Sequence, residues 1–173
     1  VQLFSGDRIA LQGPNGSGKT TLVKLLLNQL MPEQGKIERQ SFRAIYLDQT
    51  YSILSPHLSI YEQAQQFNTA ALPEHEIKIR LNRFLFGKDD WDKPCQLLSG
   101  GEKMRLIVCC LTIQQQSPDL IILDEPTNNL DLQNILMLTR AIQLYKGTLL
   151  VISHDEVFLQ EIHINKVIKL KNL

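Results

Sequence analysis

Eight consecutive residues near the start have the types and order of a phosphate-binding loop. The pattern G-x-x-x-x-G-K-[ST] is matched by Gly13, Pro14, Asn15, Gly16, Ser17, Gly18, Lys19 and Thr20. Glycines let successive backbone N–H groups point at phosphate oxygens, and a helix that starts here adds its positive end. We expect Lys19 to contact the β and γ phosphates of ATP and the Thr20 hydroxyl to complete a magnesium shell. Thr21 extends the predicted nucleotide-binding run.

Two carboxylates follow a second distinctive segment. The apolar run 120–123 has the composition of a buried parallel strand, and it ends at Asp124 and Glu125. Doubly wound sheets carry their chemistry at the carboxyl ends of strands. We expect Asp124 to hold magnesium and Glu125 to polarise an attacking water. Acidic residues after a strand can also serve only as charges at a helix N-terminus, and for Asp124 alone that alternative stays open.

Alternating strands and helices must position these residues. Apolar runs predict strands over 7–12, 44–47, 120–123 and 148–152, with a short β segment after Gly35. Helical spacing predicts helices from Lys19 to Met31, twice within 59–86, after Gly101 and from about Leu132. The second run within 59–86 carries Ile77, Leu81, Phe84 and Leu85. This alternation predicts an α/β fold with a parallel sheet.

Composition limits the class of protein. The chain has 173 residues, of which 43% are hydrophobic, so it has enough apolar material for one globular core. Lys plus Arg and Asp plus Glu each total 18, which gives no basic excess typical of nucleic-acid or membrane binding. The cysteines Cys95, Cys109 and Cys110 lack metal-site spacing, so we expect buried free thiols. We find neither a signal peptide nor an apolar stretch long enough to span a bilayer.

Downstream motifs resemble those of the ABC ATPases. The segment Leu98, Ser99, Gly100, Gly101, Glu102 is similar to their signature. The resemblance implies that Ser99 and the glycine amides reach the γ-phosphate bound by a partner domain. Ser99 and Glu102 also have the spacing of a helix capping box, and one helix N-terminus can serve both purposes.

Other positions follow the same family order. Gln49 resembles the Q-loop glutamine, which joins magnesium and the attacking water to the helical subdomain. Asp131 resembles the D-loop aspartate, and His154 resembles the switch histidine that bonds the γ-phosphate. Taken singly, Gln49 could be a surface residue and His154 an ordinary strand-end histidine. The resemblance implies a P-loop NTPase with a RecA-like core (1–55 and 96–173), a small α-helical subdomain (56–95), and ATP and Mg2+ as cofactors.

The motifs are most similar to the ABC-F branch. Its usual Asn-His pair is Asn128-Asn129 here, within the run 125–131. This resemblance implies two ATPase domains in one cytoplasmic polypeptide that acts on the ribosome and tRNA. The short interval between Gln49 and Ser99 leaves no room for the branch's ribosome-reaching arm, so we expect a second domain. We also expect an excerpt of a longer protein, whose adenine-stacking aromatic residue precedes Val1.

The expected activity is a nucleotide-gated clamp, in which two ABC domains close on ATP and hydrolysis reopens them. The parent protein would be a translation factor or would protect ribosomes from an antibiotic. A nucleotide-binding subunit of an ABC transporter is the main alternative. A non-hydrolysing interaction module is another, although Lys19, Asp124 and Glu125 are all present.

Overall fold

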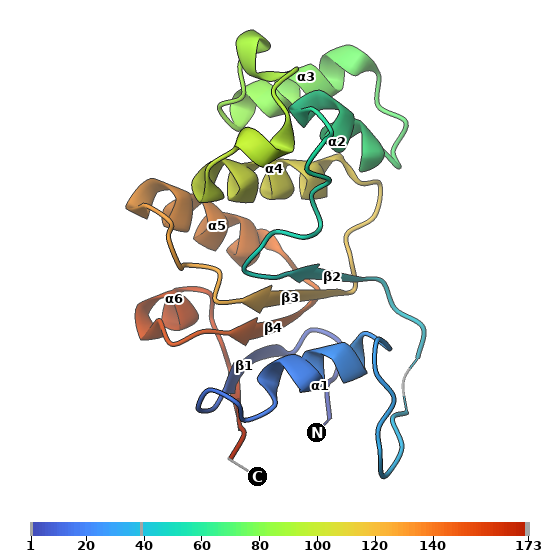
Figure 1. The fold of residues 1–173 in the computed structure, drawn as a ribbon, viewed down its shortest axis with the longest axis vertical. Helices are drawn as coiled ribbons and strands as arrows, with labels where there is room; N and C mark the ends of the chain where they lie inside the picture. The colour runs from blue at the N-terminus through green and yellow to red at the C-terminus, as the bar shows by residue number, and fades with distance from the viewer. Residues whose placement is uncertain (1, 39, 172–173) are drawn as a thin grey trace. The chain divides into compact units, whose positions relative to one another are not determined.

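A computed structural model describes residues 2–38 and 40–171 (Figure 1). Within this part of the chain the strands are β1 (Arg8–Gln12), β2 (Ala44–Leu47), β3 (Leu120–Asp124), β4 (Thr148–Ile152) and β5 (Lys166–Lys169). The α-helices are α1 (Lys19–Leu26), α2 (Ile60–Gln66), α3 (Glu74–Arg83), α4 (Gly100–Ile113), α5 (Leu132–Leu144) and α6 (Glu156–Glu161). Short 3-10 helices cover Lys88–Asp90 and Cys95–Leu97.

The strands form one parallel sheet in the order β2-β3-β4-β1-β5. The predicted strands 44–47 and 148–152 have the predicted bounds. Because all the strands are parallel, their carboxyl ends meet at one edge of the sheet. The order places β4 between β1, which leads into the predicted phosphate loop, and β3, which ends in the predicted carboxylates.

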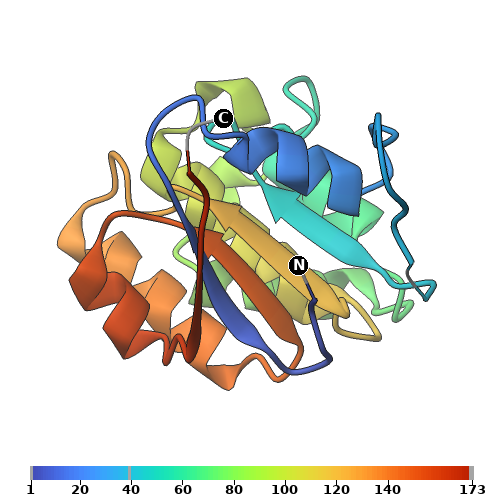
Figure 2. The ribbon, with the colours of Figure 1, turned by 90° about the horizontal axis from the view of Figure 1, so that it is seen from below.

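Helices cover both faces of this sheet. Side chains alternate between the faces of a strand, and Ile9, Leu11, Ile122 and Leu150 form one buried cluster with Val23 of α1. Figure 2 shows α1 on one side of the sheet and α6 on the other. Both Phe158 and Leu159 of α6 are buried. The sheet is therefore apolar on both faces, as the continuous apolar strands predicted.

The described residues pack into two compact units. The first holds the described residues 2–38, 40–49, 118–127 and 145–171, with the sheet, α1 and α6. The second holds residues 50–117 and 128–144, with α2, α3, α4 and α5. In the second unit α4 packs against α2, α3 and α5, which explains why α4 and α5 group with the helical residues. The division predicted from sequence placed both helices in the core instead.

Three local predictions were wrong. The helix α1 ends at Leu26, because Asn28 adopts a left-handed conformation (φ 61°) and the N–H of Gln29 turns back to the carbonyl of Lys24. Among the described residues that follow Gly35, none forms a strand before β2. The helix α3 ends at Arg83, so Leu85 lies beyond it, left-handed (φ 64°) and exposed.

The cysteines agree with the sequence prediction. All three cysteines are free and buried. Among the described helices, none has the length and apolar character needed to cross a membrane.

Candidate functional site

The loop from β1 to α1 has the backbone of a phosphate cradle. Gly16 and Gly18 adopt left-handed conformations (φ 81° and 87°), and a Cβ atom built on either would meet no atom within 4 Å. At Gly13 a Cβ atom would lie 2.6 Å from Ser17 Oγ and 2.9 Å from the Leu170 carbonyl oxygen. The loop therefore closes tightly at its base and leaves open space over its backbone, which fits a bound phosphate.

The polar side chains of Lys19 and Ser17 either bond within this loop or have no partner among the described residues. The ammonium of Lys19 donates to the carbonyl oxygens of Gly13 (2.6 Å) and Pro14 (3.0 Å). The buried Ser17 hydroxyl has no hydrogen-bond partner among the described residues. No side chain caps the start of α1 at Gly18, so its first N–H groups remain for an anion. Asn15, Thr20 and Thr21 are exposed at the same place.

The carboxyl end of β3 carries Asp124 and Glu125 in different backbone conformations. Asp124 is the last residue of the strand, whereas Glu125 is left-handed (φ 48°), a conformation costly for a residue with a side chain. The N–H of Glu125 donates to the carbonyl of Ile152 at the end of β4 (2.7 Å). This bond holds the turn that aims the Glu125 carboxylate.

His154 follows β4 and lies beside that carboxylate. His154 Nε2 is 3.6 Å from Glu125 Oε1; the side chain of Glu125 is 16% exposed, and that of His154 is 67% exposed. Gln49 lies two residues after the end of β2 and is exposed. The phosphate loop, Gln49, the two carboxylates and His154 thus all follow the carboxyl ends of parallel strands in the first unit.

Tyr46 of β2 contacts the candidate site, and no motif in the sequence indicates it. Its hydroxyl donates to Asp124 Oδ2 at 2.9 Å. The register pairs Tyr46 with Ile122, two residues before Asp124 on the same face of β3. No residue spacing within the chain reveals a strand register, so the contact could not be read from the sequence.

The oxygen atoms of the predicted site could bind a magnesium ion that is also held by waters and by phosphates of the nucleotide. Magnesium prefers oxygen ligands and usually combines one or two protein oxygens with waters and substrate phosphates. The Thr20 hydroxyl and the Asp124 carboxylate are of this kind. In the described part of the chain, no group of three or more His, Cys, Asp or Glu side chains could hold a metal by itself.

The predicted signature residues form the start of α4 in the second unit. Ser99 is the N-cap of α4: its hydroxyl accepts from the Glu102 N–H (3.2 Å), and the Glu102 carboxylate accepts from the Ser99 N–H (2.7 Å). Lys93 Nζ donates to the same carboxylate at 3.0 Å. The capping box predicted from sequence is therefore present.

The predicted D-loop residue also lies in this unit. Asp131 Oδ1 accepts from the N–H of Asn134 (2.8 Å) and from its side-chain amide (2.9 Å). Asn134 in turn packs on Gly101. The structure thus joins Asp131 to the first turn of the signature helix through one side chain.

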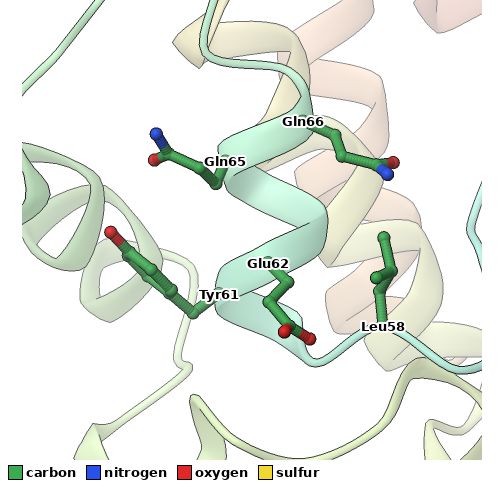
Figure 3. Close-up of a pocket in the computed structure, with 5 residues that line it drawn as sticks. All are labelled: Leu58, Tyr61, Glu62, Gln65 and Gln66. Atoms are coloured by element: carbon green, nitrogen blue, oxygen red, sulfur yellow. The ribbon is translucent and has the colours of Figure 1, made fainter.

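A surface hollow beside α2 contains none of the predicted site residues. Figure 3 shows its lining side chains, Leu58, Tyr61, Glu62, Gln65 and Gln66. Tyr61 and Gln65 point to one side of α2, while Leu58 and Gln66 lie on the other side (Figure 3). Because these residues all belong to the second unit and none is a predicted site residue, the hollow is not part of the candidate site.

The family model described as ABC transporter matches residues 1–128. The chain belongs to the ABC transporter family. The matched residues include the phosphate loop, the signature and both carboxylates. Membership makes the chain an ABC ATPase domain, of a family that generally binds and hydrolyses ATP.

Relatives place this ABC domain near the F branch. It is 39% identical over 163 residues to ATP-binding protein Uup of Escherichia coli K12, covering 91% of the chain and 25% of Uup. It is 35% identical over 184 residues to ABC transporter F family member 5 of Arabidopsis thaliana, covering 99% of the chain and 25% of that protein. The chain therefore spans about a quarter of these relatives.

A solved structure has the same fold. The structure described as the complex of archaeal ribosomal stalk protein aP1 and archaeal ribosome recycling factor aABCE1 matches with a TM-score of 0.72 and 31% identity, over 94% of the chain and 32% of the matched chain. The predicted α/β fold, a parallel sheet flanked by helices, is confirmed.

Proposed function

We propose that this ABC domain binds Mg-ATP on its phosphate loop and hydrolyses it when a second ABC domain closes over the nucleotide. Lys19 would leave the carbonyls of Gly13 and Pro14 for the β and γ phosphates. Ser17 and the uncapped start of α1 would gain the acceptors that they lack. Magnesium, held by Thr20, Gln49 and Asp124, would neutralise charge on the phosphates.

Glu125 is the proposed base. Its partly buried carboxylate is held by a turn that costs backbone strain, and such strain gathers at catalytic positions. His154, beside it, would donate to the γ-phosphate. Hydrolysis requires a water between Glu125 and the γ-phosphate, and the turn with Glu125 and the phosphate loop both follow the carboxyl ends of parallel strands.

Two anion-binding elements in different units support pairing with a second ABC domain. Ser99, Gly100 and Gly101 form the start of α4, an anion-binding geometry, on a different unit from the phosphate loop. We propose that this helix start completes the site of the partner domain, and that Asp131 contacts that partner. The γ-phosphate would then hold two domains together, and its loss would release them.

We further propose that the parent protein is a cytoplasmic ABC-F protein and a clamp acting on the ribosome, as a translation factor or in antibiotic resistance through ribosome protection. The F family member among its relatives and the run 125–131 support this branch. The matched structure of a ribosome recycling factor supports a ribosomal partner. Ribosome and tRNA contacts would come from regions other than this domain, whose charge is balanced.

Co-sedimentation with ribosomes tests this proposal. The full-length parent protein carrying Glu125→Gln should remain on ribosomes in ATP and leave them in ADP, because blocked hydrolysis traps a closed clamp. Lys19→Ala in the same background should remove retention and ATP binding together. Retention that is absent while ATP still binds would refute the ribosomal role and favour the transporter subunit. Tight ATP-driven pairing without any turnover by the wild type would favour the non-hydrolysing module.

A further inference from the structure

We propose that Tyr46 is a positioning residue that fixes the rotamer of Asp124 and so sets the affinity of the nucleotide site for its divalent cation. The inference rests on the proposed function, since it assumes that Asp124 serves a metal. Tyr46 belongs to none of the motifs predicted from the sequence.

The contact is direct and comes from the neighbouring strand. Tyr46 Oη donates to Asp124 Oδ2 at 2.9 Å. Within a parallel ladder, the phenol must reach along β3 from the level of Ile122 to the level of Asp124, about 7 Å at the rise of a strand. A tyrosine has that reach, whereas serine or threonine at the same position would not. The bond uses only Oδ2, one of the two carboxylate oxygens of Asp124.

The phenol is held in place by its own packing. Tyr46 is partly buried and packs against the cluster that includes Ile9, Ile122 and Val23, and this packing restricts the movement of its ring. A tyrosine hydroxyl carries its proton at neutral pH, so it acts as the donor in the bond to Asp124. A fixed donor orients the carboxylate, as partners of metal ligands commonly do.

Two variants separate this role from a merely structural one. Tyr46→Phe removes the hydroxyl and keeps the packed ring. Tyr145→Phe is the matched control, because the Tyr145 hydroxyl also donates a single part-buried bond, at 2.8 Å to the Pro118 carbonyl in the same unit. Both should lower thermal stability to a similar extent, since each loses one internal hydrogen bond.

The experiment is a Mn2+ titration of the full-length parent protein with a non-hydrolysable ATP analogue, with free Mn2+ read by electron paramagnetic resonance. In parallel, binding of a fluorescent ATP analogue is measured in EDTA. Tyr46→Phe should weaken Mn2+ binding about tenfold and leave metal-free nucleotide binding unchanged. Tyr145→Phe should change neither.

The outcomes are distinguishable. Wild-type protein that binds neither nucleotide nor Mn2+ would refute the proposed function itself. If the wild type binds both, equal or tighter Mn2+ binding by Tyr46→Phe would overturn the positioning role. An equal loss in Tyr46→Phe and Tyr145→Phe would also overturn it, because the effect would then come from stability alone.

Discussion

The side chain of Asn134 fills the space in which a Cβ atom on Gly101 would stand. A Cβ atom built there would lie 3.0 Å from Asn134 Cγ and closer still to its amide nitrogen. Asp131 holds that amide through its carboxylate. A larger residue at this buried position of α4 would therefore displace the Asn134 side chain, so the neighbouring helix start favours glycine here, in addition to any role in phosphate binding.

Gly101→Ala should destabilise the chain by about 1–3 kcal/mol, because overpacking pushes Asn134 away from Asp131. Asn134→Ala should cost about 1 kcal/mol, since it removes one hydrogen bond to Asp131. In the Asn134→Ala background, Gly101→Ala should become stabilising by about 0.5–1 kcal/mol, because alanine is the better helix former. Urea unfolding of the four variants measures this reversal of sign. Additive effects would show that the Asn134 contact does not limit position 101.

Ser99 and Ser59 provide a matched pair of helix caps. Ser59 caps α2 in the same way that Ser99 caps α4, with a hydroxyl that accepts at 3.2 Å in both. Replacing either serine with alanine should cost about 1 kcal/mol. In the full-length parent protein, however, Ser99→Ala should also reduce the rate of ATP hydrolysis about 100-fold, because it removes a donor to the partner's phosphate. Comparable ATPase activity in the two variants, at matched stability, would contradict the role of Ser99 in trans.

Residue patterns predicted the longer apolar strands well, but not the shortest helix and strand. The strands 44–47 and 148–152 were predicted with their observed bounds because each is a continuous apolar run. By contrast, α6 has only six residues, too few to show a helical period, and β5 alternates over just four at a sheet edge.

The sequence predicts candidate site residues where a motif carries its own chemistry. The phosphate loop and the signature are contiguous, so the sequence predicts their residues directly. The bond between Tyr46 and Asp124 depends on strand register, and the contact of Asn134 with Gly101 depends on how α5 packs on α4. Such relationships require the tertiary structure. The left-handed turn at Glu125 was equally unpredictable, because glutamate rarely adopts it.

The three thiols should resist modification while the chain is folded. Burial raises the pKa of Cys95 to about 11 and that of Cys109 to about 12, and it also raises the pKa of Cys110. Since the thiolate is the reactive form, a disulfide reagent at pH 7.5 should react with none of them in buffer and with all three in guanidinium chloride. Rapid reaction of one thiol without denaturant would show that its surroundings open locally.

Glu102 should make the stability of the chain depend on acid pH. Burial alone would raise the pKa of Glu102, but its hydrogen bonds with Ser99 and its pairing with Lys93 outweigh burial, so the pKa is lowered from 4.5. A carboxylate with a lower pKa in the folded chain stabilises the fold above its unfolded pKa, and that stabilisation disappears as the pH falls through the folded pKa.

Glu102→Gln should therefore be less stable than the wild type at pH 7, by about 1 kcal/mol or less because the side chain is partly exposed. The difference should shrink as the pH is lowered from 5 toward 3, when the wild-type carboxylate also becomes protonated. Glu33→Gln is the control, because it removes the same charge from an exposed position. Urea unfolding at a series of pH values measures both differences. A deficit in Glu102→Gln that stays constant down to pH 3 would mean that shape, rather than the charge of the carboxylate, supports the start of α4.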